Sequence, residues 1–221
     1  MLQITDNIYL FEDTCSVYVV SGKAGTVLVD FGSGEVLNHL HQFGIKPVTD
    51  VIITHHHRDQ VQGLAKARAA GIRIWVPHAE QDLFHSVDAH WQARGIFNNY
   101  NGRQDRFSLL HSVEIYDTLQ DYKEYHFGGL QWQVLPTPGH TTGSVSLLLQ
   151  YKERLYAFVG DLMYAPGKVW SLSATQWTYN GGEGIALSLA SLLDLRKRRP
   201  DLILPGHGRP FSNCVEGIDA L

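Results

Sequence analysis

The 221-residue sequence has no long apolar run, few cysteines and no excess of positive charge. No apolar stretch reaches the roughly 18 residues that a membrane span needs, so no membrane partner is expected. The net charge is −4 with histidine neutral, which argues against a nucleic-acid partner. The first residues include acids and lack a cationic start followed by an apolar run, so they are not expected to form a signal peptide. These absences predict a cytoplasmic protein.

The two cysteines, Cys15 and Cys214, stand near opposite ends of the chain without the spacing of a metal-binding pair. Two reduced thiols are therefore expected rather than a disulfide. A basic run at residues 196–199 closes an expected helix. Cations are favoured at a helix C-terminus, so this run is interpreted as part of the helix end rather than as a nucleic-acid surface.

Hydrophobic periodicity predicts strands with helices, then strands with helices again, and no linker between the two halves. This order favours an α+β fold of two sheets flanked by helices, formed by one domain over residues 1–221. Strands are expected at residues 8–12, 16–21, 26–31, 51–54, 72–76, 124–127, 130–135, 144–150, 155–159 and 202–204, the first three as an antiparallel meander. Helices are expected at residues 36–43, 61–70, 185–196 and from about residue 78. Residues 88–112 fit neither period and predict an irregular insertion or lid, and residues 162–183 predict a long loop.

Side chains that prefer metals follow the ends of four expected strands. The run His55-His56-His57-Arg58-Asp59-Gln60 follows the strand at 51–54. Alternate residues of an extended segment project the same way, so His55 and His57 are expected to converge while His56 points elsewhere. The other three positions each have a neighbouring glycine, which lets the backbone turn sharply and pass close to a ligand. They are His140, Asp161 and His207.

This combination predicts a catalytic metal site. A single histidine is more often a surface or core residue than a ligand, but a histidine run with Asp59, then Gly-His, Gly-Asp and Gly-His-Gly at strand ends is improbable by coincidence. Imidazole and carboxylate together suit zinc, iron or manganese, provided that one coordination position stays open. Such a metal lowers the pKa of bound water towards about 7 and polarises a substrate carbonyl.

The pattern resembles the metallo-β-lactamase superfamily, whose signature is His-x-His-x-Asp-His followed by a histidine, an aspartate and a final histidine. Residues 137–144, Thr-Pro-Gly-His-Thr-Thr-Gly-Ser, resemble the glyoxalase II branch. The resemblance covers nearly the whole chain and implies a four-layer αββα sandwich and a metal-dependent hydrolase that binds zinc. It further implies ligands for two metals: His55, His57 and His140 for the first, Asp59 and His207 for the second, with Asp161 bridging both.

One position departs from that signature, because Gln60 stands where the family has its third motif histidine. An amide oxygen is a weaker zinc donor than imidazole, so the second site is expected to lose affinity. Three outcomes remain open: two metals with Gln60 as a poor ligand, a second site filled only at high metal concentration, or a single-metal enzyme. A weakened second site beside one tightly bound zinc is favoured. Asp59 is then partly free to orient the attacking water or to accept its proton.

The expected substrate class follows mainly from excluding the substrates of other branches of the superfamily. Only fourteen residues follow His207, which leaves no room for the helical extension that holds glutathione in glyoxalase II. The chain also lacks the large insertions of the nuclease branches, and it lacks the export signal of secreted β-lactamases. Hydrolysis of a small-molecule ester, thioester or lactone is therefore expected. Aromatic residues form either a pocket wall or a core or dimer contact; they are Trp91, Phe97, Tyr100, Tyr164, Trp170, Trp177 and Tyr179.

Two other functional classes are alternatives. A mononuclear iron persulfide dioxygenase of the same superfamily would use His55, His140 and Asp161. A non-catalytic metal-binding module would explain the altered position of Gln60. The sequence gives no indication of the oligomeric state.

Overall fold

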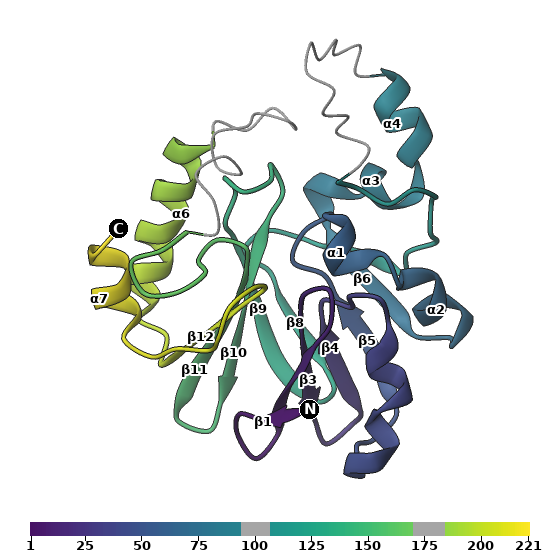
Figure 1. Cartoon of the computed structure of the whole chain (residues 1–221), viewed down its shortest axis with the longest axis horizontal. Helices are drawn as coiled ribbons and strands as arrows, with labels where there is room; N and C mark the ends of the chain where they lie inside the picture. Colours follow the sequence, from purple (N-terminus) through teal and green to yellow (C-terminus); the bar gives the residue numbers. More distant parts are fainter. Residues whose placement is uncertain (94–106, 170–183) are drawn as a thin grey trace.

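The computed structural model describes residues 1–93, 107–169 and 184–221, and in them two β-sheets pack face to face between layers of helices (Figure 1). Within these residues the first sheet has seven strands in chain order. The strands of this sheet are β1 (Leu2–Gln3), β2 (Ile8–Glu12), β3 (Ser16–Ser21), β4 (Thr26–Val29), β5 (Val48–Ile52), β6 (Arg73–Pro77) and β7 (Asp117–Leu119). Pairing is antiparallel from β1 to β4, as the predicted meander requires, and parallel from β4 to β7.

The second sheet has the order β12-β11-β10-β9-β8 within the described chain. Its strands are β8 (Glu124–Phe127), β9 (Leu130–Pro136), β10 (Val145–Tyr151), β11 (Arg154–Gly160) and β12 (Leu202–Pro205). All neighbours are antiparallel except β11 and β12, which run parallel. The last strand returns beside β11 after a helix, so the chain segments that follow β11 and β12 leave the sheet at the same edge.

Helices cover the outer face of each sheet (Figure 1). Those on the first sheet are η1 (Glu35–Asn38), η2 (Leu40–Phe43), α1 (Arg58–Val61), α2 (Leu64–Ala69), η3 (His78–Glu80), α3 (Asp82–His85) and α4 (Val87–Ala93). Those on the second sheet are α6 (Ile185–Arg198) and α7 (Cys214–Asp219). None of the helices in the described ranges has the length and apolar character required to cross a membrane.

Three hydrophobic clusters correspond to the three interfaces between the four layers. Alternate residues of one strand serve different interfaces, because successive side chains of a strand point to opposite faces. Val17 and Val19 of β3 pack towards the helices, whereas Tyr18 and Val20 pack against the second sheet, near Trp132. A third cluster joins the outer face of the second sheet to α6 and α7. This arrangement confirms the predicted α+β sandwich of αββα layers; the extent of one domain over residues 1–221 stays a prediction.

Several predicted helices are shorter than the hydrophobic periodicity indicated. The helix expected at residues 36–43 is two 3₁₀ helices, η1 and η2, that meet at His39. The helix expected at 61–70 corresponds to α2, and the chain before it forms α1; Gly63 lies between the two, and a Cβ there would lie 2.3 Å from the carbonyl carbon of Ser33. The segment from residue 78 likewise divides into η3, α3 and α4. At Gly63 close backbone packing accompanies the break, although the apolar spacing there is continuous.

Other differences concern short or weakly patterned elements. Strands β1 and β7 and helix α7 were not predicted. The insertion predicted at 88–112 is wrong for residues 88–93, which belong to α4, and its residues 94–106 lie outside the described ranges. Residues 170–183 of the predicted long loop lie outside them as well. Cys15 and Cys214 are buried free thiols, as predicted.

Candidate metal centre

The candidate ligands lie in loops that follow strand ends at one edge of the two sheets. His55 and His57 follow β5 of the first sheet, and His140 follows β9 of the second. Asp161 comes directly after β11, and His207 comes two residues after β12. The fold therefore brings together, from both sheets, the positions that the sequence singled out.

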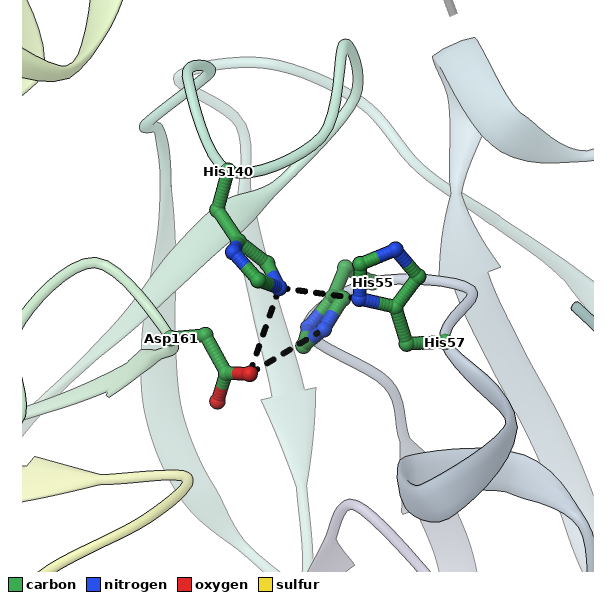
Figure 2. Close-up of side chains that lie close together, drawn as sticks. All are labelled: His55, His57, His140 and Asp161. Atoms are coloured by element: carbon green, nitrogen blue, oxygen red, sulfur yellow. Dashed lines mark hydrogen bonds and ion pairs between the residues drawn. The ribbon is translucent and has the colours of Figure 1, made fainter. Parts of the chain in front are cut away.

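Four of these side chains point their donor atoms at one another (Figure 2). His57 Nδ1 lies 2.8 Å from His140 Nε2, which lies 3.2 Å from Asp161 Oδ2. His55 Nε2 lies 3.8 Å from the same carboxylate oxygen. Each pair of ligand atoms in this group of His55, His57, His140 and Asp161 is within 4.8 Å. We call these four residues the first cluster.

The first cluster fits a metal ion both in spacing and in chemistry. Donors held tetrahedrally at about 2.0–2.2 Å from zinc are about 3.4 Å apart, which lies within the observed range of separations. His55 Nε2 is buried and has no hydrogen-bond partner among the described residues. A buried polar atom without a partner is costly, and a cation at the centre of the first cluster would satisfy this one.

The electrostatics of the first cluster favour neutral imidazoles beside an ionised carboxylate. Burial lowers the pKa of His55 to about 4, against a partly compensating effect of Asp161. Burial, followed by the neighbouring His140 and His55 rings, lowers the pKa of His57 well below its ordinary value. Although burial opposes ionisation of Asp161, the imidazoles of His140 and His55 lower its pKa to about 2. Near neutral pH the cluster therefore offers neutral imidazoles at His55 and His57 beside the ionised carboxylate of Asp161.

A second cluster lies beside the first and consists of Asp59, Asp161 and His207. His207 Nε2 is 2.8 Å from Asp59 Oδ2 and 3.6 Å from Asp161 Oδ2. Partial burial opposes protonation of His207, but the hydrogen bond to Asp59 and the charge of Asp161 raise its pKa. Because Oδ2 of Asp161 faces both clusters, it occupies the place of a shared ligand.

Gln60 lies fully buried beside the second cluster. Its Nε2 is 3.3 Å from Asp161 Oδ1 and 3.3 Å from His207 Nε2. Its Oε1 is buried and has no hydrogen-bond partner among the described residues. The residue predicted as a poor ligand is thus at the second cluster, where its neutral amide contacts Asp161 and His207.

A chain of hydrogen bonds that the sequence analysis did not identify orients His55. His55 Nδ1 lies 3.0 Å from Thr54 Oγ1, and that hydroxyl lies 2.9 Å and 3.0 Å from the two carboxylate oxygens of Asp30. With Nδ1–H donating to Thr54 and the hydroxyl donating to Asp30, the lone pair of His55 is on Nε2 and faces the first cluster. Such partners fix the tautomer and ring orientation of a metal-binding histidine. The signal available in the sequence was an aspartate directly after a buried strand, with a glycine two residues later.

The glycines beside the candidate ligands are needed for close packing. A Cβ on Gly206 would lie 2.5 Å from Asp161 Oδ1. A Cβ on Gly160 would lie 2.8 Å from Thr54 Oγ1, and Gly160 also has φ +50°, which favours glycine. These two residues let the ends of β11 and β12 approach the carboxylate and the hydroxyl.

Comparison with known proteins places this site in a family. A model of the metallo-beta-lactamase superfamily matches residues 10–207, a range that contains all the candidate ligands. The chain belongs to the metallo-beta-lactamase superfamily. The resemblance inferred from the histidine and aspartate pattern is thereby confirmed.

Curated relatives extend this family assignment. A Streptococcus pyogenes protein named "Probable metallo-hydrolase" is 26% identical over 207 residues, which cover 90% of this chain and 81% of the relative. The hydroxyacylglutathione hydrolase of Ectopseudomonas mendocina is 28% identical over 142 residues, 63% of this chain and 43% of that enzyme. This match thus spans less than half the length of the hydroxyacylglutathione hydrolase. The predicted class, a metal-dependent hydrolase of this superfamily with a glyoxalase II-like pattern, is confirmed.

Solved structures share the fold. BJP-1, a subclass B3 metallo-beta-lactamase of Bradyrhizobium japonicum, superimposes with a TM-score of 0.75 at 19% identity, covering 99% of this chain and 88% of that one. A Cronobacter sakazakii metallo-beta-lactamase described by a HARLDQ motif has a TM-score of 0.67 at 20% identity, covering 93% and 79%. That motif ends in Asp-Gln, as residues 55–60 do here.

Proposed function

We propose that the protein hydrolyses a small ester, thioester or lactone with a water molecule activated at the first cluster. The observation that carries this proposal is the convergence of His55, His57, His140 and Asp161 from two sheets, with all donor atoms within 4.8 Å. Zinc is the proposed metal, because imidazole and carboxylate are donors that it prefers and because zinc at a catalytic site can take a water as a further ligand. When bound, such an ion supplies a water of lowered pKa and polarises a carbonyl oxygen.

Asp59 is the proposed catalytic residue. Its side chain is 42% exposed, so it faces both the metal centre and solvent from which water and substrate arrive. Its Oδ2 contacts His207 Nε2 at 2.8 Å, which holds the carboxylate in place. In this position Asp59 orients the attacking water and accepts its proton, as general bases do within hydrogen-bond reach of their target.

The second cluster is proposed to bind metal more weakly than the first. Asp59, Asp161 and His207 supply its strong donors, and Gln60 adds a neutral amide. An amide donates no charge and competes poorly with imidazole for zinc. One tightly bound metal with a second held weakly follows from this difference.

Two aromatic residues of the described chain support an apolar substrate group. Phe107 is 50% exposed and its ring centroid lies 6.2 Å from that of His57. Tyr164 is 37% exposed, and its ring packs closely against Gly208, directly after His207. Trp91, by contrast, lies in α4 and donates to Ser108 Oγ at 3.0 Å. The other predicted pocket aromatics lie outside the described residues; they are Phe97, Tyr100, Trp170, Trp177 and Tyr179.

A substrate panel tests the proposal. Zinc-loaded protein is assayed with aryl esters, acyl thioesters including an S-acyl glutathione, and lactones of different acyl length, with Asp59→Asn as the inactive control. Turnover of at least one class, lost in Asp59→Asn, supports hydrolysis. Absence of turnover across the panel contradicts the proposal. Oxygen consumption by iron-loaded protein with a persulfide would instead support the dioxygenase alternative.

A further inference from the structure

Glu80 joins the two loops that carry the ligands of the first cluster. It closes η3, and only 2% of the residue is exposed. Its Oε2 accepts a hydrogen bond of 2.8 Å from the backbone N–H of His56 and lies 3.1 Å from His56 Nδ1. Its Oε1 accepts a hydrogen bond of 3.1 Å from the backbone N–H of Gly143. One buried carboxylate therefore contacts both loops.

The residues that Glu80 contacts, His56 and Gly143, lie close in the sequence to candidate ligands of the first cluster. His56 stands between His55 and His57, in the loop that leaves the first sheet. Gly143 stands three residues after His140, in the loop that leaves the second sheet. Glu80 thus holds the backbone of both loops, rather than the donor atoms, close to the place where the two loops meet.

The fit between Glu80 and Gly143 is tight. A Cβ on Gly143 would lie 2.5 Å from Glu80 Cγ and 3.0 Å from Ala79 Cβ. The loop after His140 therefore passes too close to the glutamate for any side chain at that position. This close contact fixes the distance between the loop and Glu80, in addition to the hydrogen bond from the backbone N–H of Gly143.

We propose that Glu80 is a positioning residue that sets the separation of His57 and His140 and thereby the metal affinity of the first cluster. Those two rings approach to 2.8 Å although they come from different sheets (Figure 2). Glu80 is a buried side chain that joins their loops. In the second cluster, Asp59 and His207 are held by a direct contact with each other. The inference rests on the first cluster being the metal site of the proposed function.

Metal affinity is the primary test. Apoprotein of the wild type, Glu80→Gln and Glu80→Ala is titrated with zinc against a chelator, and the visible absorption of the cobalt-loaded forms is compared. Glu80→Gln keeps one acceptor oxygen and is expected to lower the first zinc affinity by about 10-fold, and Glu80→Ala by up to about 100-fold, the range for partners that orient ligands. The cobalt spectrum is expected to change with them, since ligand geometry changes.

Asp50 offers a matched control. It is a fully buried carboxylate on β5, and its oxygens accept from Arg73 Nη2 at 2.8 Å and from Trp75 Nε1 at 2.9 Å. Asp50→Asn is expected to reduce stability but to leave zinc affinity and the cobalt spectrum at wild-type values. A general loss of stability would affect both variants alike, whereas a positioning role affects Glu80 alone.

A second pair of variants, Gly143→Ala alone and combined with Glu80→Ala, keeps the test valid if one of the other variant proteins does not fold. Gly143→Ala is expected to weaken zinc binding in the wild type by pushing the loop from Glu80 Cγ, but to cost much less when combined with Glu80→Ala. Unchanged affinity and spectrum in Glu80→Gln, or additive effects of Gly143→Ala and Glu80→Ala, would overturn the inference. Failure of the wild type to bind zinc would instead refute the proposed function, so the two failures are distinguishable.

Discussion

The amide of Gln60 contacts the carboxylate of Asp161, with Nε2 3.3 Å from Oδ1. Oδ2 of the same carboxylate is the oxygen that faces the histidines of both clusters. The two oxygens of Asp161 therefore have different partners, one an amide and the other the imidazoles. This division favours a carboxylate that uses one oxygen for the metal while the other is fixed by the protein.

Metal stoichiometry should follow from the identity of residue 60. Protein purified without added metal is expected to retain about one metal per chain, and Gln60→His is expected to approach two, because imidazole replaces an amide beside Asp59 and His207. Elemental analysis after dialysis against a weak chelator measures this. His140→Ala is the control that should remove the tightly bound metal. Two tightly held metals in the wild type would refute the weakened second cluster.

Loss of the Asp59 carboxylate should stop turnover without removing the first metal. Asp59→Asn is expected to lower kcat by about 10²–10⁴-fold, the range for a general base. Circular dichroism and zinc content are expected to stay close to wild type, because Asp59 belongs only to the second cluster. Steady-state kinetics on any substrate from the panel provides the measurement. Wild-type kcat in this variant would exclude Asp59 from proton transfer.

The hydroxyl of Thr54 is expected to raise the zinc affinity of the first cluster by orienting His55. Thr54→Val keeps the side-chain shape but removes the hydroxyl between His55 Nδ1 and Asp30, so the first zinc affinity is expected to fall by about 10–100-fold. Thr137→Val is the matched control, because the buried hydroxyl of Thr137 pairs with Ser146 Oγ at 3.0 Å. Equal affinities for the two variants in chelator competition would remove Thr54 from this role.

Acid should destabilise the metal-free protein between about pH 6.5 and pH 4. Burial lowers the pKa of His55 from 6.5 to about 4, so in this window the unfolded chain binds a proton that the folded chain does not. The contribution of His55 to stability is complete above pH 6.5 and decreases as the pH falls, by about 3 kcal/mol for a shift of this size. The difference between wild type and His55→Asn isolates it from the opposite contribution of Asp30, whose pKa burial raises to about 7. Urea unfolding of apoprotein at several pH values measures it, with His55→Asn showing a smaller decrease. The exposed His126→Gln should behave like the wild type, and identical slopes for His55→Asn and wild type would contradict the prediction.

The candidate ligands could be recognised in the sequence because their chemistry is local. Gly-His-Thr and Gly-Asp after apolar strands are visible without a structure, and the strand bounds 8–12, 16–21 and 124–127 were correct because these short segments of β-favouring residues adjoin turn-forming residues. Parallel or neighbouring strand ends then bring distant ligands together, which is a property of sheets rather than of particular side chains.

Residues that act through others were not predictable in this way. Glu80 follows the strand β6 at the start of an expected helix, and its partners are 24 and 63 residues distant in the chain. Helix interruptions were missed for a similar reason, since Gly63 divides α1 from α2 through contact with Ser33. Such contacts depend on which loops meet, and single-sequence periodicity contains no information on that.

The ligands of the first cluster are divided between the sheets, with His55 and His57 on one and His140 and Asp161 on the other. Each half of the sandwich alone supplies two of the four donors of the first cluster. The complete cluster therefore forms only when both halves have docked, and an ion bound there would link the two sheets. Metal binding would accordingly be a late event in folding. Removal of the metal should weaken the interface between the two sheets before either sheet unfolds.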